Sequence, residues 1–163
     1  MLKNLFINLR YKLFNKFVLK VKLLDDNIEA RLLPKYMKDG DACMDVSSSI
    51  DITIKPKETV AIPLGFAVEL PKGYELQVRN RSGLAKAGLI IPNGIGTIDS
   101  GYRGEVHMML YNTTTKPYII KKYDRIGQVV INKVPFMVIQ QIHELSKTER
   151  GNNGFGSTGV KWN

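Results

Sequence analysis

The sequence is poor in the residues that bind soft metals or form covalent cross-links. Among its 163 residues are one cysteine, Cys43, and two histidines, His107 and His143. A single cysteine excludes a disulfide within the chain, and this set leaves too few ligands for a cysteine-rich zinc site or another transition-metal centre. No apolar run approaches the roughly 18 residues that a membrane-spanning helix needs. We therefore expect a soluble body whose chemistry uses oxygen and nitrogen groups.

The overall composition is that of an ordinary folded domain. Hydrophobic residues make up 44% of the chain and charged residues 24%, which is typical of one globular unit with a single core. The sequence has no Gly-x-x-x-x-Gly-Lys-Ser/Thr motif and no alternation of strand and helix patterns. Nucleotide-binding folds built on parallel sheets are therefore disfavoured.

Period-two alternation of apolar residues dominates the chain from Phe17 onward. Ile50, Ile52 and Ile54 alternate with polar residues. Similar runs span 58–70, 74–79, 104–111, 117–121, 125–133 and 136–142, and turn-forming residues interrupt them at 55–57, 71–73, 112–114 and 135. This pattern predicts an all-β antiparallel barrel or sandwich with one short helix over 83–88.

Positive charge is concentrated at the start of the chain. The net charge is +9, and residues 1–24 contain six of the 24 Lys and Arg residues but no acidic residue. Apolar residues at helical spacing from Leu2 to Phe17 could form a basic amphipathic helix that contacts an anionic surface. We favour a disordered extension over 1–19, although an organelle-targeting leader or an interaction arm remains open. A β-barrel over 20–145 and a flexible flap over 146–163 complete the expected organisation.

The glycine-rich stretch near the C-terminus combines several groups that suit a nucleotide. Residues 150–159 contain four glycines, and such a segment cannot hold a fixed conformation alone because glycine loses the most backbone freedom on ordering. The same stretch carries the Arg150 guanidinium, the Phe155 ring and the hydroxyls of Ser157 and Thr158. These groups suit a phosphate chain and a flat base. We interpret the segment as a flap that closes over a ligand.

A second group lies in the glycine-bracketed turn over 94–104. Its closely spaced glycines allow a sharp hairpin and a close approach of backbone to a ligand. The turn presents one carboxylate, Asp99, and one phenol, Tyr102. Capping the turn is the commonest role for such an aspartate, yet the tightness of this turn also fits one wall of a small-molecule cleft.

Three shorter pieces are individually weak. Arg81 and Ser82 precede the predicted short helix, as in a phosphate-binding turn, although Arg-Ser-Gly is more often a helix cap. Asp124 and Arg125 are expected by default to form a surface ion pair. Asp45 is expected by default to be a turn residue.

Taken in chain order, these pieces resemble the motifs of the homotrimeric dUTP pyrophosphatases. The motifs are Arg-Ser-Gly, Gly-x-Ile-Asp-x-x-Tyr-x-Gly, Asp-Arg-Ile-x-Gln and Arg-Gly-x-x-Gly-Phe-Gly-Ser-Thr-Gly, all in the family's order and spacing. The resemblance runs from about Val21 to Gly159. It implies a jelly-roll-type β-barrel, a homotrimer with shared active sites, and a C-terminal segment that closes over a site formed by the other two subunits.

The resemblance also implies roles for individual residues. Asp99 would activate the water that attacks the α-phosphorus of dUTP, releasing dUMP and pyrophosphate, and so supply dUMP and keep uracil out of DNA. Mg²⁺ would be the cofactor, held chiefly by the phosphates, with Asp45 in its outer shell through water. The remaining expected ligands bind the substrate: Arg81, Ser82, Gly83 and Gln128 at the phosphates; Arg150, Gly156, Ser157 and Thr158 in the flap; Phe155 over the uracil; Asn93, Gly96 and Thr97 at the base; and Tyr102 under the deoxyribose, where a 2′-hydroxyl would collide.

Three positions depart from the family pattern. Cys43 and Tyr123 stand where relatives usually have glycine, and Asn153 replaces a glycine of the flap. Positive φ is expected at Tyr123 and Asn153, and asparagine tolerates it better than tyrosine. The side chain of Cys43 is expected to narrow the approach to Asp45 and to weaken the use of Mg²⁺.

The same sequence features are compatible to different degrees with three other functions. A dCTP deaminase shares the fold but needs a glutamate on the strand after the hairpin, where this chain has apolar residues and His107. A non-catalytic regulator could use the same trimer as a binding platform. Stable nucleic-acid binding by residues 1–24 is not expected, because few aromatic stacking residues interleave the basic ones. We expect a cytoplasmic protein, with organelle targeting by the N-terminus left open.

Overall fold

The computed structural model describes residues 18–25, 30–155, 157 and 159. The amphipathic pattern of residues 1–17 therefore lies outside the described residues, as do the predicted ligands Gly156 and Thr158. The first strand begins at Lys20, where the sequence pattern predicts the start of the barrel. None of the described helices is long and apolar enough to cross a membrane.

Within the described residues the regular secondary structure is almost entirely β, as predicted. The strands are β1 (Lys20–Leu23), β2 (Met44–Ser47), β3 (Ile52–Ile54), β4 (Thr59–Pro63), β5 (Phe66–Glu69), β6 (Tyr74–Arg79), β7 (Leu89–Ile90), β8 (Gly96–Ile98), β9 (His107–Asn112), β10 (Tyr118–Ile120) and β11 (Arg125–Lys133). A short 3-10 helix, η1 (Ala30–Leu32), and one α-helix, α2 (Ser82–Lys86), interrupt them. The α-helix lies one to two residues earlier than the predicted range.

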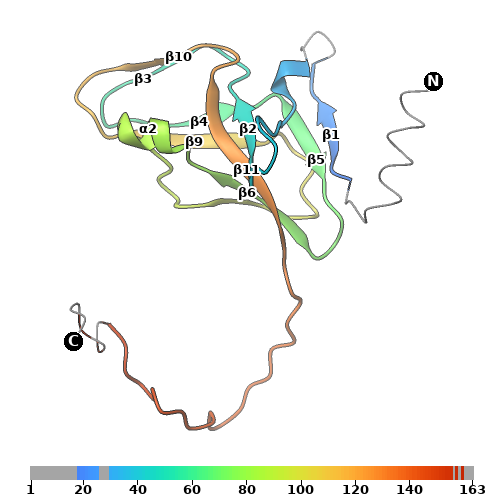
Figure 1. Cartoon of the computed structure of the whole chain (residues 1–163), viewed down its shortest axis with the longest axis vertical. Helices are drawn as coiled ribbons and strands as arrows, with labels where there is room; N and C mark the ends of the chain where they lie inside the picture. Colours follow the sequence, from blue (N-terminus) through green and yellow to red (C-terminus); the bar gives the residue numbers. More distant parts are fainter. Residues whose placement is uncertain (1–17, 26–29, 156, 158, 160–163) are drawn as a thin grey trace.

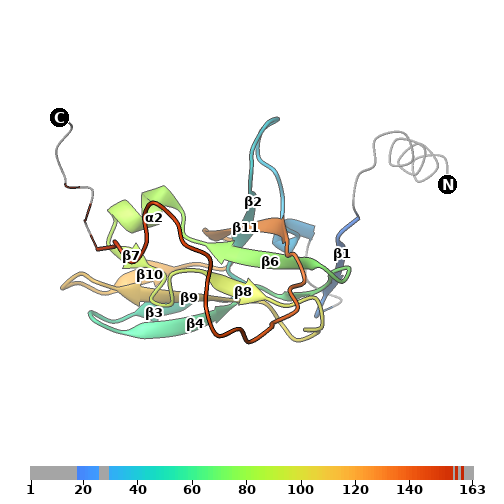
Figure 2. The same cartoon turned by 90° about the horizontal axis from the view of Figure 1, so that it is seen from below.

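The strands form a two-layered antiparallel sandwich. One sheet has the order β2-β11-β6-β8, a second has the order β4-β9-β7, and β1–β5 and β3–β10 form separate pairs. Figure 2 shows the four-stranded sheet lying over the layer of β3, β4, β9 and β10. Side chains with period-two spacing fill the space between the layers. On β9, for example, Met108 and Leu110 are fully buried, whereas His107 and Met109 are exposed.

The predicted strand over 136–142 is wrong. Its residues are in no strand, and Phe136, Val138 and Ile139 are almost completely exposed. Figure 1 shows this segment leaving the sandwich after β11. A strand needs a hydrogen-bonding neighbour, and one chain offers this segment none, so the alternating pattern remains without a partner. A second predicted run, 58–70, is divided between β4 and β5 at Gly65, which has φ of 76°.

The turn before β11 contains one of the few non-glycine residues at positive φ. Tyr123 has φ of 73°, as expected for a position where relatives carry glycine. Its N–H donates to the Ser48 carbonyl at 2.8 Å, and the cations of Arg31 and Lys122 lie 5.6 and 5.2 Å from its ring centroid. These contacts hold the strained residue in place. Asn153, by contrast, is not at positive φ, so that expectation is wrong.

Candidate active site

Residues 94–104 form one wall of an apolar cavity of about 250 Å³. They contain no hairpin, because their one strand, β8, pairs with β6. Four predicted ligands line it, namely Asn93, Gly96, Thr97 and Tyr102. The opposite walls come from β4, β6 and β9 and include Ala61, Val78 and Met109. Gly96 lies directly opposite Val78 in the sheet, and a Cβ added to it would be 3.2 Å from Val78 Cβ. A larger residue at position 96 would therefore press on the floor of the cavity.

Asp99 follows directly on β8, the strand that lines this cavity. Its side chain is exposed, and its carbonyl accepts the N–H of Tyr102 at 3.0 Å. The Arg103 guanidinium donates to the carbonyls of Ser100 and Tyr102, both at 2.7 Å. The loop is therefore braced by its own backbone and leaves the Asp99 carboxylate facing solvent.

A second site centres on Asp45, which is only 8% exposed. On the antiparallel strands β2 and β11, Asp45 lies directly opposite Gln128, so their side chains share one face of the sheet. The Gln128 amide nitrogen donates to Asp45 Oδ1 at 3.0 Å. Asp45 is therefore a buried strand residue, and its expected default role in a turn is wrong.

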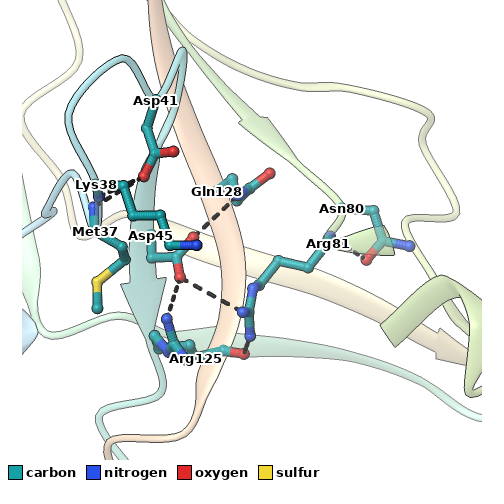
Figure 3. Close-up of polar contacts among 8 residues, drawn as sticks. All are labelled: Met37, Lys38, Asp41, Asp45, Asn80, Arg81, Arg125 and Gln128. Atoms are coloured by element: carbon teal, nitrogen blue, oxygen red, sulfur yellow. Dashed lines mark hydrogen bonds and ion pairs between the residues drawn. The ribbon is translucent and has the colours of Figure 1, made fainter. Parts of the chain in front are cut away.

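Two guanidinium groups contact the other oxygen of this carboxylate. Arg125 Nη1 lies 2.9 Å from Asp45 Oδ2, and Arg81 Nη2 lies 3.5 Å from it. Arg81 also donates to the Arg125 carbonyl at 2.7 Å. Figure 3 shows these side chains converging from β2, β11 and the residue before α2.

A β-bulge brings Arg125 to this cluster. Arg125 and Gln128 are three residues apart, a spacing that would put them on opposite faces of a regular strand. The register shifts between Arg125 and Gly127, so that Arg125 lies opposite Ser47, two residues from Asp45. The bulge therefore turns both side chains to the same face. Arg125 does not form the expected ion pair with Asp124, because the Asp124 carboxylate accepts the Lys121 N–H at 2.8 Å instead.

The Asp45 cluster borders a polar cavity of about 370 Å³. Its lining adds the loop over 37–43, including Lys38 and Cys43. Asp41 holds this loop closed by accepting the backbone N–H groups of Met37 and Lys38 at 3.1 and 2.8 Å. The lining thus carries three cations around one buried carboxylate, a combination that favours an anion.

The donor set also suits a weakly held magnesium ion. Across the part of the chain that the structure describes, no three His, Cys, Asp or Glu residues gather closely enough to hold a metal themselves. Mg²⁺ is commonly bound through one or two carboxylates together with substrate phosphates and retained waters. Asp45 supplies one carboxylate, and its oxygens have lone pairs beyond those used by Arg125 and Gln128. The residues present therefore fit an ion that the protein contacts through water.

Seven of the predicted site residues line these two cavities, which share no lining residue: Asn93, Gly96, Thr97 and Tyr102 line the first, and Asp45, Arg81 and Gln128 line the second. Asp99 lines neither cavity. Ser82 and Gly83 follow Arg81 at the start of α2 and are exposed. Of the predicted flap residues, the three that the structure describes line neither cavity: the Arg150 side chain donates to the Asn153 carbonyl at 3.0 Å, Phe155 is fully exposed, and Ser157 is exposed as well. Ser157 donates its N–H to the Gly154 carbonyl within the same segment. One chain thus forms two parts of the expected site as separate cavities and leaves the flap apart from both.

Comparisons with known proteins identify this arrangement. The dUTPase family model matches residues 29–159. The chain belongs to the dUTPase family. A deoxyuridine 5′-triphosphate nucleotidohydrolase of Zymomonas mobilis is 48% identical over 128 residues, which cover 78% of this chain and 88% of that one. The corresponding protein of Caldanaerobacter subterraneus is 45% identical over 146 residues, covering 88% of this chain and 98% of that one.

A solved dUTPase shares the architecture. The dUTPase of Staphylococcus bacteriophage 80alpha with dUpNHpp superposes with a TM-score of 0.81 at 29% identity, covering 89% of this chain and all of that one. This likeness confirms the predicted jelly-roll class, and family membership confirms the prediction of a hydrolase of the dUTPase type. The family assignment accounts for the motifs in their order along the chain.

For several residues of the site, the sequence did not indicate which neighbours they contact. Lys38 lies in a polar loop that resembles any surface turn, and Arg125 reaches Asp45 only because of the bulge. Gly127, an isolated glycine inside a strand pattern, is the one clue to that bulge. Glu105 and His107 line the apolar cavity, and period-two counting on β9 could have placed His107 on the exposed face.

Proposed function

We propose that the chain hydrolyses dUTP to dUMP and pyrophosphate in a Mg²⁺-dependent reaction. The observation that carries this proposal is the convergence of Arg81, Arg125 and Gln128 on the buried Asp45 carboxylate. The guanidiniums offer the charge that a triphosphate needs, and Ser82 and Gly83 adjoin them at the start of α2. When bound, Mg²⁺ would neutralise phosphate charge and align the phosphates for in-line attack.

The apolar cavity is proposed to hold the nucleoside. Asn93 would bind the edge of the uracil together with the backbone of Gly96 and Thr97, and Tyr102 would contact the deoxyribose. Asp99, at the end of the same strand, would accept a proton from the attacking water. A general base in this position typically contributes about 10²–10⁴-fold to the rate, and the arginines stabilise charge that develops on the phosphates.

We further propose that the active site is completed by neighbouring copies of the chain in a homotrimer. In support, the nucleoside cavity and the phosphate cavity are lined by separate residues. The apolar residues over 136–142 are exposed in one chain, and their burial requires another surface. The segment over 150–159 would then cross to another subunit, where Arg150, Ser157 and Thr158 engage the terminal phosphate and Phe155, beside Gly156, stacks on the base.

A second activity on the same fold, dCTP deamination, finds no support in the cavity. Its lining contains one carboxylate, that of Glu105, and this group already accepts the Gly65 N–H at 2.8 Å. From β9, Met109 cannot transfer protons, and His107 Nδ1 lies 3.1 Å from the Glu105 carbonyl oxygen. The lining therefore offers no carboxylate without a hydrogen-bond partner for chemistry on the base.

The deciding experiment is pyrophosphate release from dUTP, dCTP, dTTP and UTP by the full chain, with Mg²⁺ and with EDTA. The proposal expects release from dUTP alone, and only when the metal is present. Ammonia release from dCTP would instead establish a deaminase. Binding of dUTP without release of pyrophosphate would favour the regulatory alternative, and a monomer at all protein concentrations would overturn the shared site.

A further inference from the structure

The ring of Tyr102 lies directly against Gly104 two residues further along the chain. A Cβ built on Gly104 would be 2.6 Å from Tyr102 Cζ and 3.1 Å from its Cε2, with the hydroxyl oxygen closer still. Contacts below about 3.0 Å are essentially never made by real Cβ atoms. Any side chain at position 104 therefore excludes the present position of the Tyr102 ring.

Backbone conformation does not account for this glycine. Seven described glycines have positive φ, and Gly104 is not among them. Its φ lies outside the left-handed range that favours glycine over alanine. The close approach of the Tyr102 ring is therefore the feature that requires glycine at position 104.

A hydrogen bond holds the same, hydroxyl-bearing end of the Tyr102 ring in place. Its hydroxyl donates to the Glu105 carbonyl at 3.0 Å, and His107 Nδ1 lies 3.1 Å from that same oxygen. The Glu105 carboxylate accepts the Gly65 N–H, which anchors this stretch to the turn between β4 and β5. Tyr102 and His107, which both line the apolar cavity, thus share one fixed acceptor.

We propose that Gly104 is a positioning residue for sugar discrimination, acting through Tyr102. This inference rests on the proposed function, in which Tyr102 contacts the deoxyribose. Because Gly104 lacks a side chain, the Tyr102 ring can lie against the loop backbone. In this position it would contact the 2′ carbon of the bound deoxyribose. A methyl group at position 104 displaces the ring, which can rotate at little cost to the fold, and opens space for a 2′-hydroxyl.

The test compares Gly104→Ala with Gly101→Ala, a matched control in the same loop where an added Cβ meets nothing within 4 Å. The measured quantity is kcat/KM for dUTP divided by kcat/KM for UTP. We expect Gly104→Ala to lower this ratio by roughly 10- to 100-fold, since small displacements at a reacting centre have effects of this size. Gly101→Ala should leave it unchanged.

A double-substitution cycle separates positioning from general damage to the fold. If Gly104 acts through the ring, adding Gly104→Ala to Tyr102→Ala changes the ratio no further. An additional fall in the double variant, or an unchanged ratio in Gly104→Ala alone, would overturn the inference.

A second measurement needs no turnover. Calorimetry on the same variants gives the affinities for dUMP and UMP, whose ratio again reports the preference for deoxyribose. Preference for dUMP that weakens in Gly104→Ala supports the inference even if the wild-type chain releases no pyrophosphate, in which case the proposed hydrolysis alone fails. Equal binding of the two nucleotides by the wild type would overturn the inference.

Discussion

Gln128 and Asp45 lie opposite each other on antiparallel strands, and the amide nitrogen of Gln128 donates to Asp45 Oδ1 at 3.0 Å. This pairing is a direct consequence of sheet register, because a slip of one residue would turn Gln128 to the other face. The bulge that follows Arg125 then adds a guanidinium on the second oxygen. The polar cluster is thus built by strand pairing and not by a flexible loop.

Replacement of Asp45 should weaken the use of magnesium. In Asp45→Asn the amide keeps the size of the side chain but loses the charge that would attract a hydrated cation. We expect the Mg²⁺ concentration for half-maximal pyrophosphate release to rise by roughly 10- to 100-fold, the usual effect of losing an outer-shell ligand. Asp51→Asn, at a position that does not line the cavity, is the control. Superimposable magnesium titrations for wild type and Asp45→Asn would exclude this role.

Asp99→Asn should separate binding from turnover. The amide cannot accept the proton of the attacking water, so kcat should fall by about 10² or more. Affinity for dUTP, measured by calorimetry in Mg²⁺, should stay within a few-fold of wild type because Asp99 lies at the exposed end of β8. Undiminished turnover in this variant would rule out the proposed base.

Removal of residues 150–163 should abolish efficient turnover without disturbing assembly. The described part of this segment contacts none of the buried core, so the barrel has no need of it. Light scattering coupled to gel filtration should give the same molar mass for the truncated and full-length proteins. Dissociation of the truncated protein would show that the segment holds the copies together.

Gly127→Ala should destabilise the fold. The new methyl group would lie 2.9 Å from Met108 Sδ and 3.2 Å from Val46 Cγ2, two residues of the packed interior. Overpacking of this kind costs about 1–3 kcal/mol, measurable as a lower midpoint in urea. Gly101→Ala, in open space, should unfold like wild type. An unchanged midpoint for Gly127→Ala would mean that β11 shifts freely at the bulge.

Asp51 should contribute to stability above acidic pH only. The Lys122 N–H and then the Lys121 ammonium lower the pKa of this carboxyl below 3.8. A lowered folded-state pKa stabilises the protein above the unfolded-state value, and the contribution disappears as the pH falls through the folded-state value. The melting temperature of Asp51→Asn should therefore be lower than that of wild type at pH 7, and the difference should shrink near pH 3. A constant difference would contradict the assignment.

The sequence predicted those parts of the fold in which one face of a strand is buried. Met108 and Leu110 alternate with exposed neighbours, and this alternation is visible without coordinates because burial on one face selects it. The helix after Arg81 and the positive φ of Tyr123 were also predictable, the second from the family pattern. The run over 136–142 gave a wrong prediction although it shows the same alternation. Its apolar side chains have no surface within one chain against which to be buried.

The site was less predictable than the fold, because its contacts join distant strands. Asp45 and Arg125 are 80 residues apart, and their contact depends on which strand pairs with β11 and where the bulge falls. The pairing of the strands is not encoded in the local pattern around either residue, and Gly127 is the one local sign of the bulge. The motif resemblance supplied the roles, whereas the mutual geometry of Arg81, Arg125 and Gln128 required the structure.

The nucleoside cavity and the phosphate cavity have no lining residue in common, and this separation has a genetic consequence. If copies complete each other's sites, a chain lacking the Asp99 carboxylate still carries an intact Asp45 cluster, and a chain altered at Asp45 still carries an intact segment over 94–104. Two inactive alleles of these kinds, co-expressed in one cell, should complement each other, because mixed assemblies regain some sites in which both halves are whole.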